Sequence, residues 1–139
     1  MKAVVIKTTG SIYPVTLTKP LHRSAGAIVN DQIEVVRPIN LKRPYVLICA
    51  ESGRLKDMPL NLVASYLYGT HHHGNPIVGD VIIMRENGVD LVGLEDLELL
   101  RIQSQMSGLW DLLYQLEMEA QEEEDAERYW NEADHGEEE

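Results

Sequence analysis

The chain has 139 residues, enough for one domain with its own core, and it contains no Phe, so that core must use aliphatic side chains with a few Tyr and Trp. A single cysteine excludes an internal disulfide, and the sequence has no run of about 20 apolar residues, the length that a membrane-spanning helix needs. The net charge of −11 lies in the C-terminal part, because residues 1–101 sum to +1 and residues 102–139 sum to −12, which argues against direct nucleic acid binding by this tail.

The N-terminal half predicts four strands and one short helix, from the alternation of apolar residues and from helix-like spacing after Pro20. In chain order these are strands over 2–8 and 11–18, a helix over about 20–29, and strands over 32–37 and 45–50. Pro14 removes a ladder donor and so indicates an edge strand or a bulge. The run 45–50 is almost unbroken apolar sequence, which is typical of a central strand buried on both faces.

The C-terminal half predicts two more strands among helices. A helix follows Pro59 and ends at Gly69; strands are expected over 77–84 and 89–92, joined by the turn Asn87-Gly88. From Leu94 the pattern is helical, with a break expected at Ser107-Gly108. After Met118 the apolar stripe fades into acidic sequence, and residues 121–139 are either a charged helix or disordered.

These elements predict an α+β fold. We expect a mixed, mainly antiparallel sheet of about six strands with two short helices, followed by C-terminal helices and an acidic tail. The corresponding division is an α+β domain over 1–100, an amphipathic helix over 101–120 and the acidic tail over 121–139. The N-terminus lacks the long apolar stretch and cleavage site of a signal peptide, so a cytoplasmic location is expected.

The middle of the chain resembles a known family. The strand 33–36, the pattern Gly-x-Leu-x-x-x-Pro-x-Asn within 51–61 and the pattern Ile-Val-Gly-Asp within 76–83 are similar to domain-of-unknown-function family 3846. The likeness covers roughly residues 1–100. It implies no established activity. It implies a setting among accessory genes of phages, bacteria and mobile elements.

Four polar residues are candidates for a small-ligand or nucleotide site: Asn61, His73, Asn75 and Asp80. Asn61 stands at a helix start, where anions are attracted, although an Asn there more often satisfies a backbone group. Gly79-Asp80 inside an apolar strand most simply marks a bulge or a close backbone approach. The sequence names no partner that would make Asp80 catalytic.

The run of three histidines suggests a metal site, with His71 and His73 as the candidate ligands. Neighbouring residues of an extended loop point in opposite directions, however, and the spacing matches no structural zinc site. An exposed loop is the simpler interpretation, and we predict no cofactor. A metal-dependent enzyme is therefore the least favoured hypothesis.

The C-terminal helix is the candidate partner-binding element. Its stripe of leucines, Leu109, Leu112, Leu113 and Leu116, either packs on the chain's own domain or binds a protein partner or a second copy. Basic residues of the body form an anion-binding patch, dock the acidic tail of the same or a neighbouring chain, or are scattered solvated charges; they are Arg37, Lys42, Arg43, Arg54 and Lys56. No nucleophile–base pair stands out, so the sequence favours a non-enzymatic protein-interaction module, with a ligand-sequestering protein as the alternative.

Overall fold

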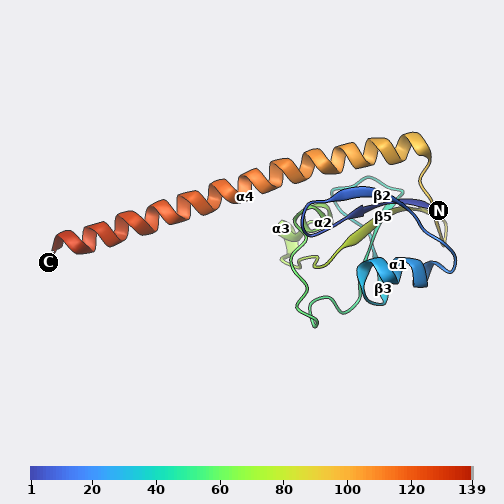
Figure 1. Ribbon diagram of the computed structural model, residues 1–139, viewed down its shortest axis with the longest axis horizontal. Coiled ribbons are helices and arrows are strands. Elements are labelled where there is room, and N and C mark those ends of the chain that lie inside the picture. Colours follow the sequence, from blue (N-terminus) through green and yellow to red (C-terminus); the bar gives the residue numbers. More distant parts are fainter. Residues whose placement is uncertain (139) are drawn as a thin grey trace.

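A six-stranded sheet lies between helices in the computed structural model, which describes residues 1–138 and the surroundings of side chains as far as residue 130 (Figure 1). The strands run in the order β2-β1-β5-β4-β3, and β6 also pairs with β5. Every strand pair is antiparallel. The fold is therefore α+β, as the sequence predicts.

The N-terminal half holds four strands and one helix. Their bounds are β1 Lys2–Ile6, β2 Ile12–Thr16, α1 Leu21–Val29, β3 Ile33–Val36 and β4 Tyr45–Ala50. All six residues of β4 are buried, which confirms it as a central strand. Pro14 lies in β2, an edge strand, where its missing N–H leaves no gap in the ladder.

The C-terminal half contains three helices and two strands, with bounds α2 Leu62–Tyr68, α3 Thr70–His73, β5 Val81–Asn87, β6 Asp90–Val92 and α4 Asp96–Glu138. Asn61 caps α2 through its side chain, and Gly69 ends that helix in the left-handed conformation, with φ of +91°. The expected hairpin between β5 and β6 is present, with Gly88 at a positive φ in its turn.

Each face of the sheet carries its own apolar core, because successive strand residues point to opposite sides. One face is covered by α1, with Ala25 and Val29 packed on Val5, Ile48 and Ile82. The other face is covered by α2 and the first part of α4, in the cluster that holds Leu47, Val63, Leu67, Ile83, Ile102 and Met106. The molecule thus has three layers, with the sheet in the middle.

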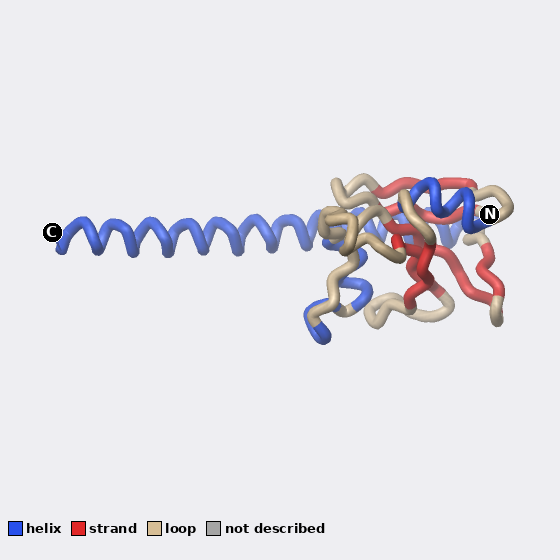
Figure 2. The backbone as a smooth tube through the Cα atoms, turned by 90° about the horizontal axis from the view of Figure 1, so that it is seen from below, coloured by secondary structure: helices blue, strands red, loops and turns tan. Residues whose placement is uncertain are grey.

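The expected break at Ser107-Gly108 is wrong, because α4 is one continuous helix of 43 residues. Side chains on both sides of the glycine hold the helix on the sheet: Met106 is buried and Leu109 packs on the same core. Tertiary contacts therefore outweigh the low helix propensity of glycine. A helix of this length spans roughly 65 Å, and Figure 2 shows that much of it extends beyond the body.

Two smaller expectations also need correction. The strand predicted over 77–84 begins at Val81, while Val78 forms only an isolated bridge with Leu60. The histidine run is the short helix α3 rather than an extended loop, since Gly69 and Gly74 cap its two ends. Both differences arise where glycines at positive φ redirect the backbone.

Candidate functional site

The first half of α4 belongs to the body. Ile102 and Met106 are buried against the sheet, and Leu109 and Leu113 are partly buried on the same cluster. Trp110 packs against the turn between β1 and β2, so closely that a Cβ at Gly10 would overlap its indole ring. Two of the predicted partner-binding leucines, Leu109 and Leu113, therefore contact the chain's own core.

The other two predicted leucines remain exposed. Leu112 is 54% exposed although the neighbouring Leu113 still packs on the core, and Leu116, one turn further along α4, is 52% exposed. Beyond this point α4 projects from the body (Figures 1 and 2). Tyr114 and Met118, at 48% and 45%, lie on the opposite side of the same helix turns, since residues four apart share a face. Apolar side chains therefore lie on more than one side of this segment, with Asp111, Gln115 and Glu117 between them.

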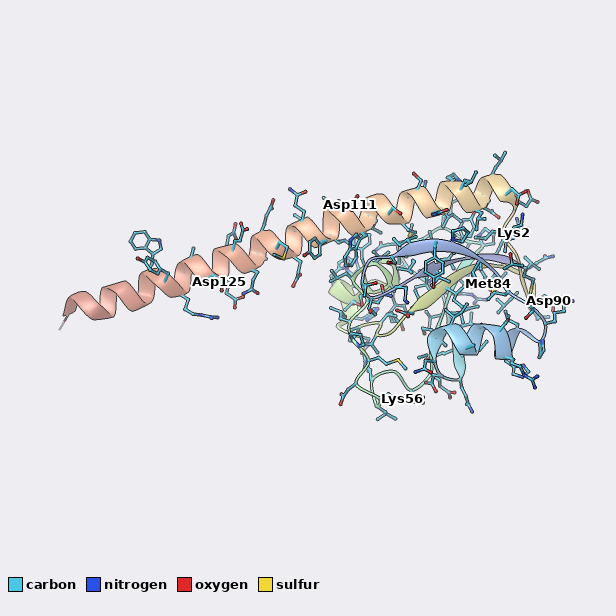
Figure 3. The ribbon with its side chains drawn as sticks, viewed as in Figure 1. Lys2, Lys56, Met84, Asp90, Asp111 and Asp125 are labelled. Carbon is cyan, nitrogen blue, oxygen red and sulfur yellow. The ribbon has the colours of Figure 1, made fainter. Side chains whose placement is uncertain are left out.

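The projecting helix is strongly acidic beyond this segment. Among residues 122–127 only Ala126 is uncharged, and the other five are Glu or Asp. Figure 3 shows Asp111 where α4 leaves the body and Asp125 well outside it. Residues 102–127 contain no Lys or Arg, so no residue of this segment neutralises the acids.

A basic cluster lies at the other end of α4, around Tyr45. The Tyr45 hydroxyl donates a hydrogen bond of 2.5 Å to Glu98 and accepts one of 2.8 Å from Arg101. Arg85 contacts the same Glu98 carboxylate at 3.6 Å. The loop before β4 adds Lys42 and Arg43, both exposed, and Lys42 accepts a backbone hydrogen bond from Tyr45.

Arg37 extends this cluster along β5. Its guanidinium donates two hydrogen bonds to Glu86, at 3.2 and 3.0 Å, and the backbone N–H of Glu86 donates to the carbonyl of Pro44. The cluster thus contains five Lys or Arg side chains, namely Arg37, Lys42, Arg43, Arg85 and Arg101, and two carboxylates. Positive charge therefore predominates within this cluster.

The pKa shifts in this cluster follow its contacts. Burial raises the pKa of Tyr45, and the hydrogen bond to Glu98 adds to the increase. Burial alone would also raise the pKa of Glu98; the hydrogen bonds from Tyr45 and from the backbone of Glu95, with the charges of Arg85 and Arg101, hold it below its ordinary value. Tyr45 therefore stays a neutral donor to the Glu98 carboxylate, and its hydroxyl oxygen accepts from Arg101.

A cavity of about 430 Å³ lies beside the edge strand β3, within the size range of small-ligand pockets. Its polar lining includes Glu34, Glu51 and Arg54, and Arg54 donates a hydrogen bond of 3.4 Å to Asn75, which also lines it. Of the four predicted ligand residues, Asn75 is in this lining. Asn61, His73 and Asp80 lie outside it.

Asn61 and Asp80 hold backbone together. Asn61 is 1% exposed, and its amide donates to the carbonyls of Ile6 and Gly79, at 3.0 and 2.9 Å, while its oxygen accepts from the N–H of Ala64. Asp80 accepts a hydrogen bond of 3.0 Å from the backbone N–H of Thr8. All these contacts are to the protein's own main chain, which is the structural alternative that the sequence left open for Asn61.

The histidines of α3 contact their own surroundings. The Nδ1 atom of His73 accepts from the N–H of Asn75 at 3.1 Å, which places the ring proton on Nε2, 3.3 Å from the carbonyl of Tyr68. His71 stacks on Tyr66, with ring centroids 5.8 Å apart. Within the described part of the chain, no group of three or more His, Cys, Asp or Glu side chains is placed to hold a metal ion. Metal binding by His71 and His73 stays a prediction.

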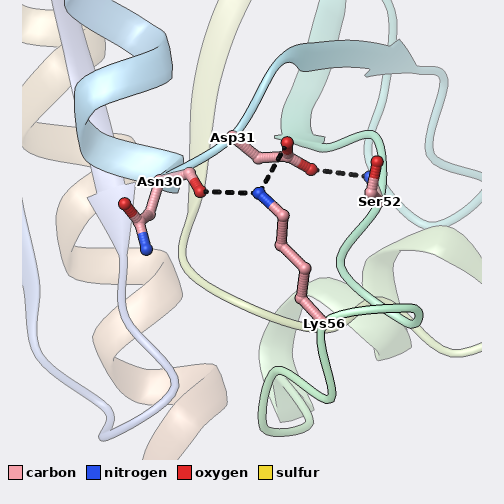
Figure 4. Close-up of polar contacts among 4 residues, drawn as sticks. All are labelled: Asn30, Asp31, Ser52 and Lys56. Carbon is pink, nitrogen blue, oxygen red and sulfur yellow. Dashed lines mark hydrogen bonds and ion pairs between the residues drawn. The ribbon is translucent and has the colours of Figure 1, made fainter.

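A separate ion pair fixes the loop that follows β4. Asp31 accepts hydrogen bonds from Lys56 at 2.9 Å and from the backbone N–H of Ser52 at 2.7 Å, as Figure 4 shows. The bond from Lys56, followed by that from Ser52, lowers the pKa of Asp31 to about 2. This contact holds the loop against the end of α1. It lies before the start of β3, whereas Arg37 of the basic cluster follows the end of that strand.

Sequence reasoning missed Arg101, Gly108 and Tyr45 as parts of one surface. Arg101 could have been singled out from the sequence, because it is the last basic residue before the acidic segment. Gly108 was interpreted as a helix break. Nothing in the sequence around Tyr45 indicates its contacts to α4, because they join residues 53 and 56 positions apart.

The fold and this surface define an α+β body that carries a long, partly uncovered C-terminal helix. The model of the family described as "Domain of unknown function (DUF3846)" matches residues 1–107. The chain therefore belongs to this family, and the match ends within α4, just before Gly108. Neither the curated proteins nor the solved structures yield a match.

Within the described residues, no helix is long and apolar enough to cross a membrane. This includes α4, which is long enough but carries too many charged side chains.

Proposed function

We propose that this chain is a non-enzymatic protein-interaction module that binds its partner through the projecting half of α4. The observation that carries the proposal is the exposure of Leu112 and Leu116, each about half exposed where α4 leaves the body. An apolar helix face that is uncovered in one copy is a common recognition element, because an amphipathic helix binds by laying that face in a groove.

The body supports this role because it holds α4 in a fixed direction. The direction in which α4 leaves the sheet is fixed by Trp110, which packs on Gly10, and by the buried residues Ile102 and Met106. A helix held in this way loses less freedom on binding than a flexible tail would. As part of the same proposal, the module acts in the cytoplasm, among the accessory proteins of phages or mobile elements that the family resemblance implies.

Capture from a lysate of the expressing organism tests the proposal, with three forms of the immobilised full-length protein. The native form is compared with Leu112→Gln plus Leu116→Gln, and with the control Leu100→Gln plus Met118→Gln. Leu100 and Met118 are also exposed, at 60% and 45%, but lie on another face of α4. Proteins retained by the native form and the control, and lost with the Leu112/Leu116 variant, are the expected result.

Equal capture by all three forms would count against the proposal. Truncation at Gly108 is a poorer test, because it also removes Leu109, Trp110 and Leu113, which pack on the body. Point substitutions on the exposed face leave those contacts in place, so they separate binding from folding.

A second candidate function is the binding of a small ligand or nucleotide, which the cavity beside β3 favours. Its floor includes Val36, Cys49 and Ile77, and Arg54 with Asn75 offers donors to an anionic group. The combination of an apolar floor with a few convergent polar groups is typical of small-ligand sites.

Thermal denaturation with a panel of nucleotides and small anions tests this candidate. A ligand that binds only the folded chain raises the melting temperature in step with its concentration. The rise should disappear in Arg54→Ala. If no compound of the panel changes the melting temperature, this candidate is dropped.

A further inference from the structure

One face of α4 is exposed along its whole middle part. Residues three and four apart lie on one side of a helix, so a single face holds residues 101, 105, 108, 112, 116, 119 and 123. All seven are exposed. The face begins over the body, at Arg101, and ends on the acidic projecting half, at Glu123.

Gly108 stands in the middle of this face. A glycine is among the least favourable residues inside a helix. Among the described residues, nothing beyond the helix backbone and its chain neighbours lies within 4 Å of where a Cβ of Gly108 would be. Packing within one copy therefore gives no reason for a glycine here, whereas a second helix crossing at this point would, because small residues permit close approach.

The charge on this face changes sign from one end to the other. At the start lies Arg101, which donates to the Tyr45 hydroxyl of the basic cluster. The far end carries Glu119 and Glu123, with further acids on either side. Leu112 and Leu116 lie between these ends and supply the apolar centre.

We propose that α4 pairs with α4 of a second copy in antiparallel orientation, through the face of Arg101, Gly108, Leu112 and Leu116. This rests on the proposed function of α4 as the interaction element and names a second copy as its partner. Pairing centred near Leu112 places Leu116 of each copy opposite Gly108 of the other. It also places Glu119 and Glu123 of each copy beside the partner copy's basic end.

Charge selects this orientation. A parallel pair would place Arg101 beside Arg101 of the other copy and one acidic segment beside the other, which is repulsive at both ends. The antiparallel pair replaces both repulsions by attractions. It is also a closed, two-fold arrangement, in which the same surface is used on both copies.

Sedimentation equilibrium of the full chain tests the association. The native protein is expected to be a dimer. Leu112→Gln plus Leu116→Gln should raise the dimer dissociation constant by about thirtyfold or more, because both residues lie at the centre of the contact. The control Leu100→Gln plus Met118→Gln, on another face of the helix, should leave it within about twofold of native.

Disulfide cross-linking tests the orientation. Gln105→Cys in one batch of protein and Glu119→Cys in another are mixed, with the buried Cys49 replaced by Ala in both. Antiparallel pairing predicts a cross-link between the two different variants, and parallel pairing predicts cross-links between identical ones. Gln105 and Glu119 are both exposed and lie on one face, so the two new cysteines do not disturb the core.

Salt provides a second readout that does not depend on any substitution. The dimer should weaken as ionic strength rises, since its end contacts are solvent-exposed ion pairs. A monomer at every concentration, or a dimer that survives the Leu112/Leu116 variant unchanged, overturns the inference. A monomer that still loses captured proteins with that variant would overturn only the inference and leave the proposed function standing.

Discussion

The half of α4 that lies on the sheet and the half that projects from it both carry apolar side chains at helical spacing, yet only the first half has a stripe that packs on the sheet. Ile102 and Met106 are nearly inaccessible, whereas Leu112 and Leu116 are about half exposed. Apolar spacing therefore identifies a helix face without showing what packs on it. Whether an apolar side chain of α4 is covered depends on which side of the helix it occupies and on whether that part of the helix still lies over the sheet.

The largest difference between the two halves is expected from a matched pair of alanine substitutions, Ile102→Ala and Leu116→Ala. Ile102 is 1% exposed, so its truncation leaves a cavity and should lower the free energy of unfolding by about 4 kcal/mol. Leu116→Ala should lower it by less than about 0.5 kcal/mol in the monomer. Urea denaturation at low protein concentration measures both. Equal losses would mean that the projecting half is covered in one copy as well.

Sequence reasoning predicted the body well because local patterns there agree with the tertiary packing. The apolar run 45–50 became β4 with the predicted bounds, and Asn87-Gly88 formed the predicted hairpin turn. It failed at Ser107-Gly108, where propensity favoured a break and contacts on both sides kept the helix whole.

The candidate site was less predictable than the fold. The leucine stripe was visible in the sequence, but its division into covered Leu109 and Leu113 and exposed Leu112 and Leu116 depends on which side of α4 faces the sheet and on where the sheet ends. The basic cluster around Tyr45 joins β4, β5 and α4, whose order in the chain gives no indication that they meet. Long-range pairing of this kind is absent from local periodicity.

The next test concerns the point where the two regions join. Gly10→Ala forces a side chain into the Trp110 ring at a backbone φ of +93°, and should lower the free energy of unfolding by about 2 kcal/mol. The control Gly74→Ala has a similar φ of +77° with nothing within 4 Å among the described residues, and should cost only about 1 kcal/mol. The difference between the two variants reports the Trp110 contact. No difference would mean that Trp110 does not anchor α4 at this turn.

A smaller, pH-dependent effect is expected from Asp31, which stabilises the body far from α4. Its pKa is lowered from 3.8 to about 2, first by the hydrogen bond from Lys56 and then by that from Ser52. A carboxyl whose pKa is depressed in the folded state adds stability above its unfolded pKa, and this contribution is lost as the pH falls through the folded value. Native protein should therefore exceed Asp31→Asn in stability at neutral pH, and the gap should close between about pH 4 and pH 2. Thermal melts of both forms across this range measure it, and a gap that is constant down to pH 2 would contradict the ion pair.

The smallest effect is expected at the cavity beside β3. It concerns the reactivity of the Cys49 thiol and leaves the stability of the fold unchanged. Burial, and then the charge of Glu34, raises the pKa of the Cys49 thiol from 9.0 to about 11. At pH 8 the folded protein should contain roughly a hundredfold less thiolate than an unfolded chain, and so react correspondingly more slowly with iodoacetamide. Mass spectrometry of native and urea-unfolded protein measures the two rates, and Glu34→Gln should accelerate the native reaction modestly. Fast alkylation of native protein would mean that the reagent reaches the Cys49 thiol through the cavity.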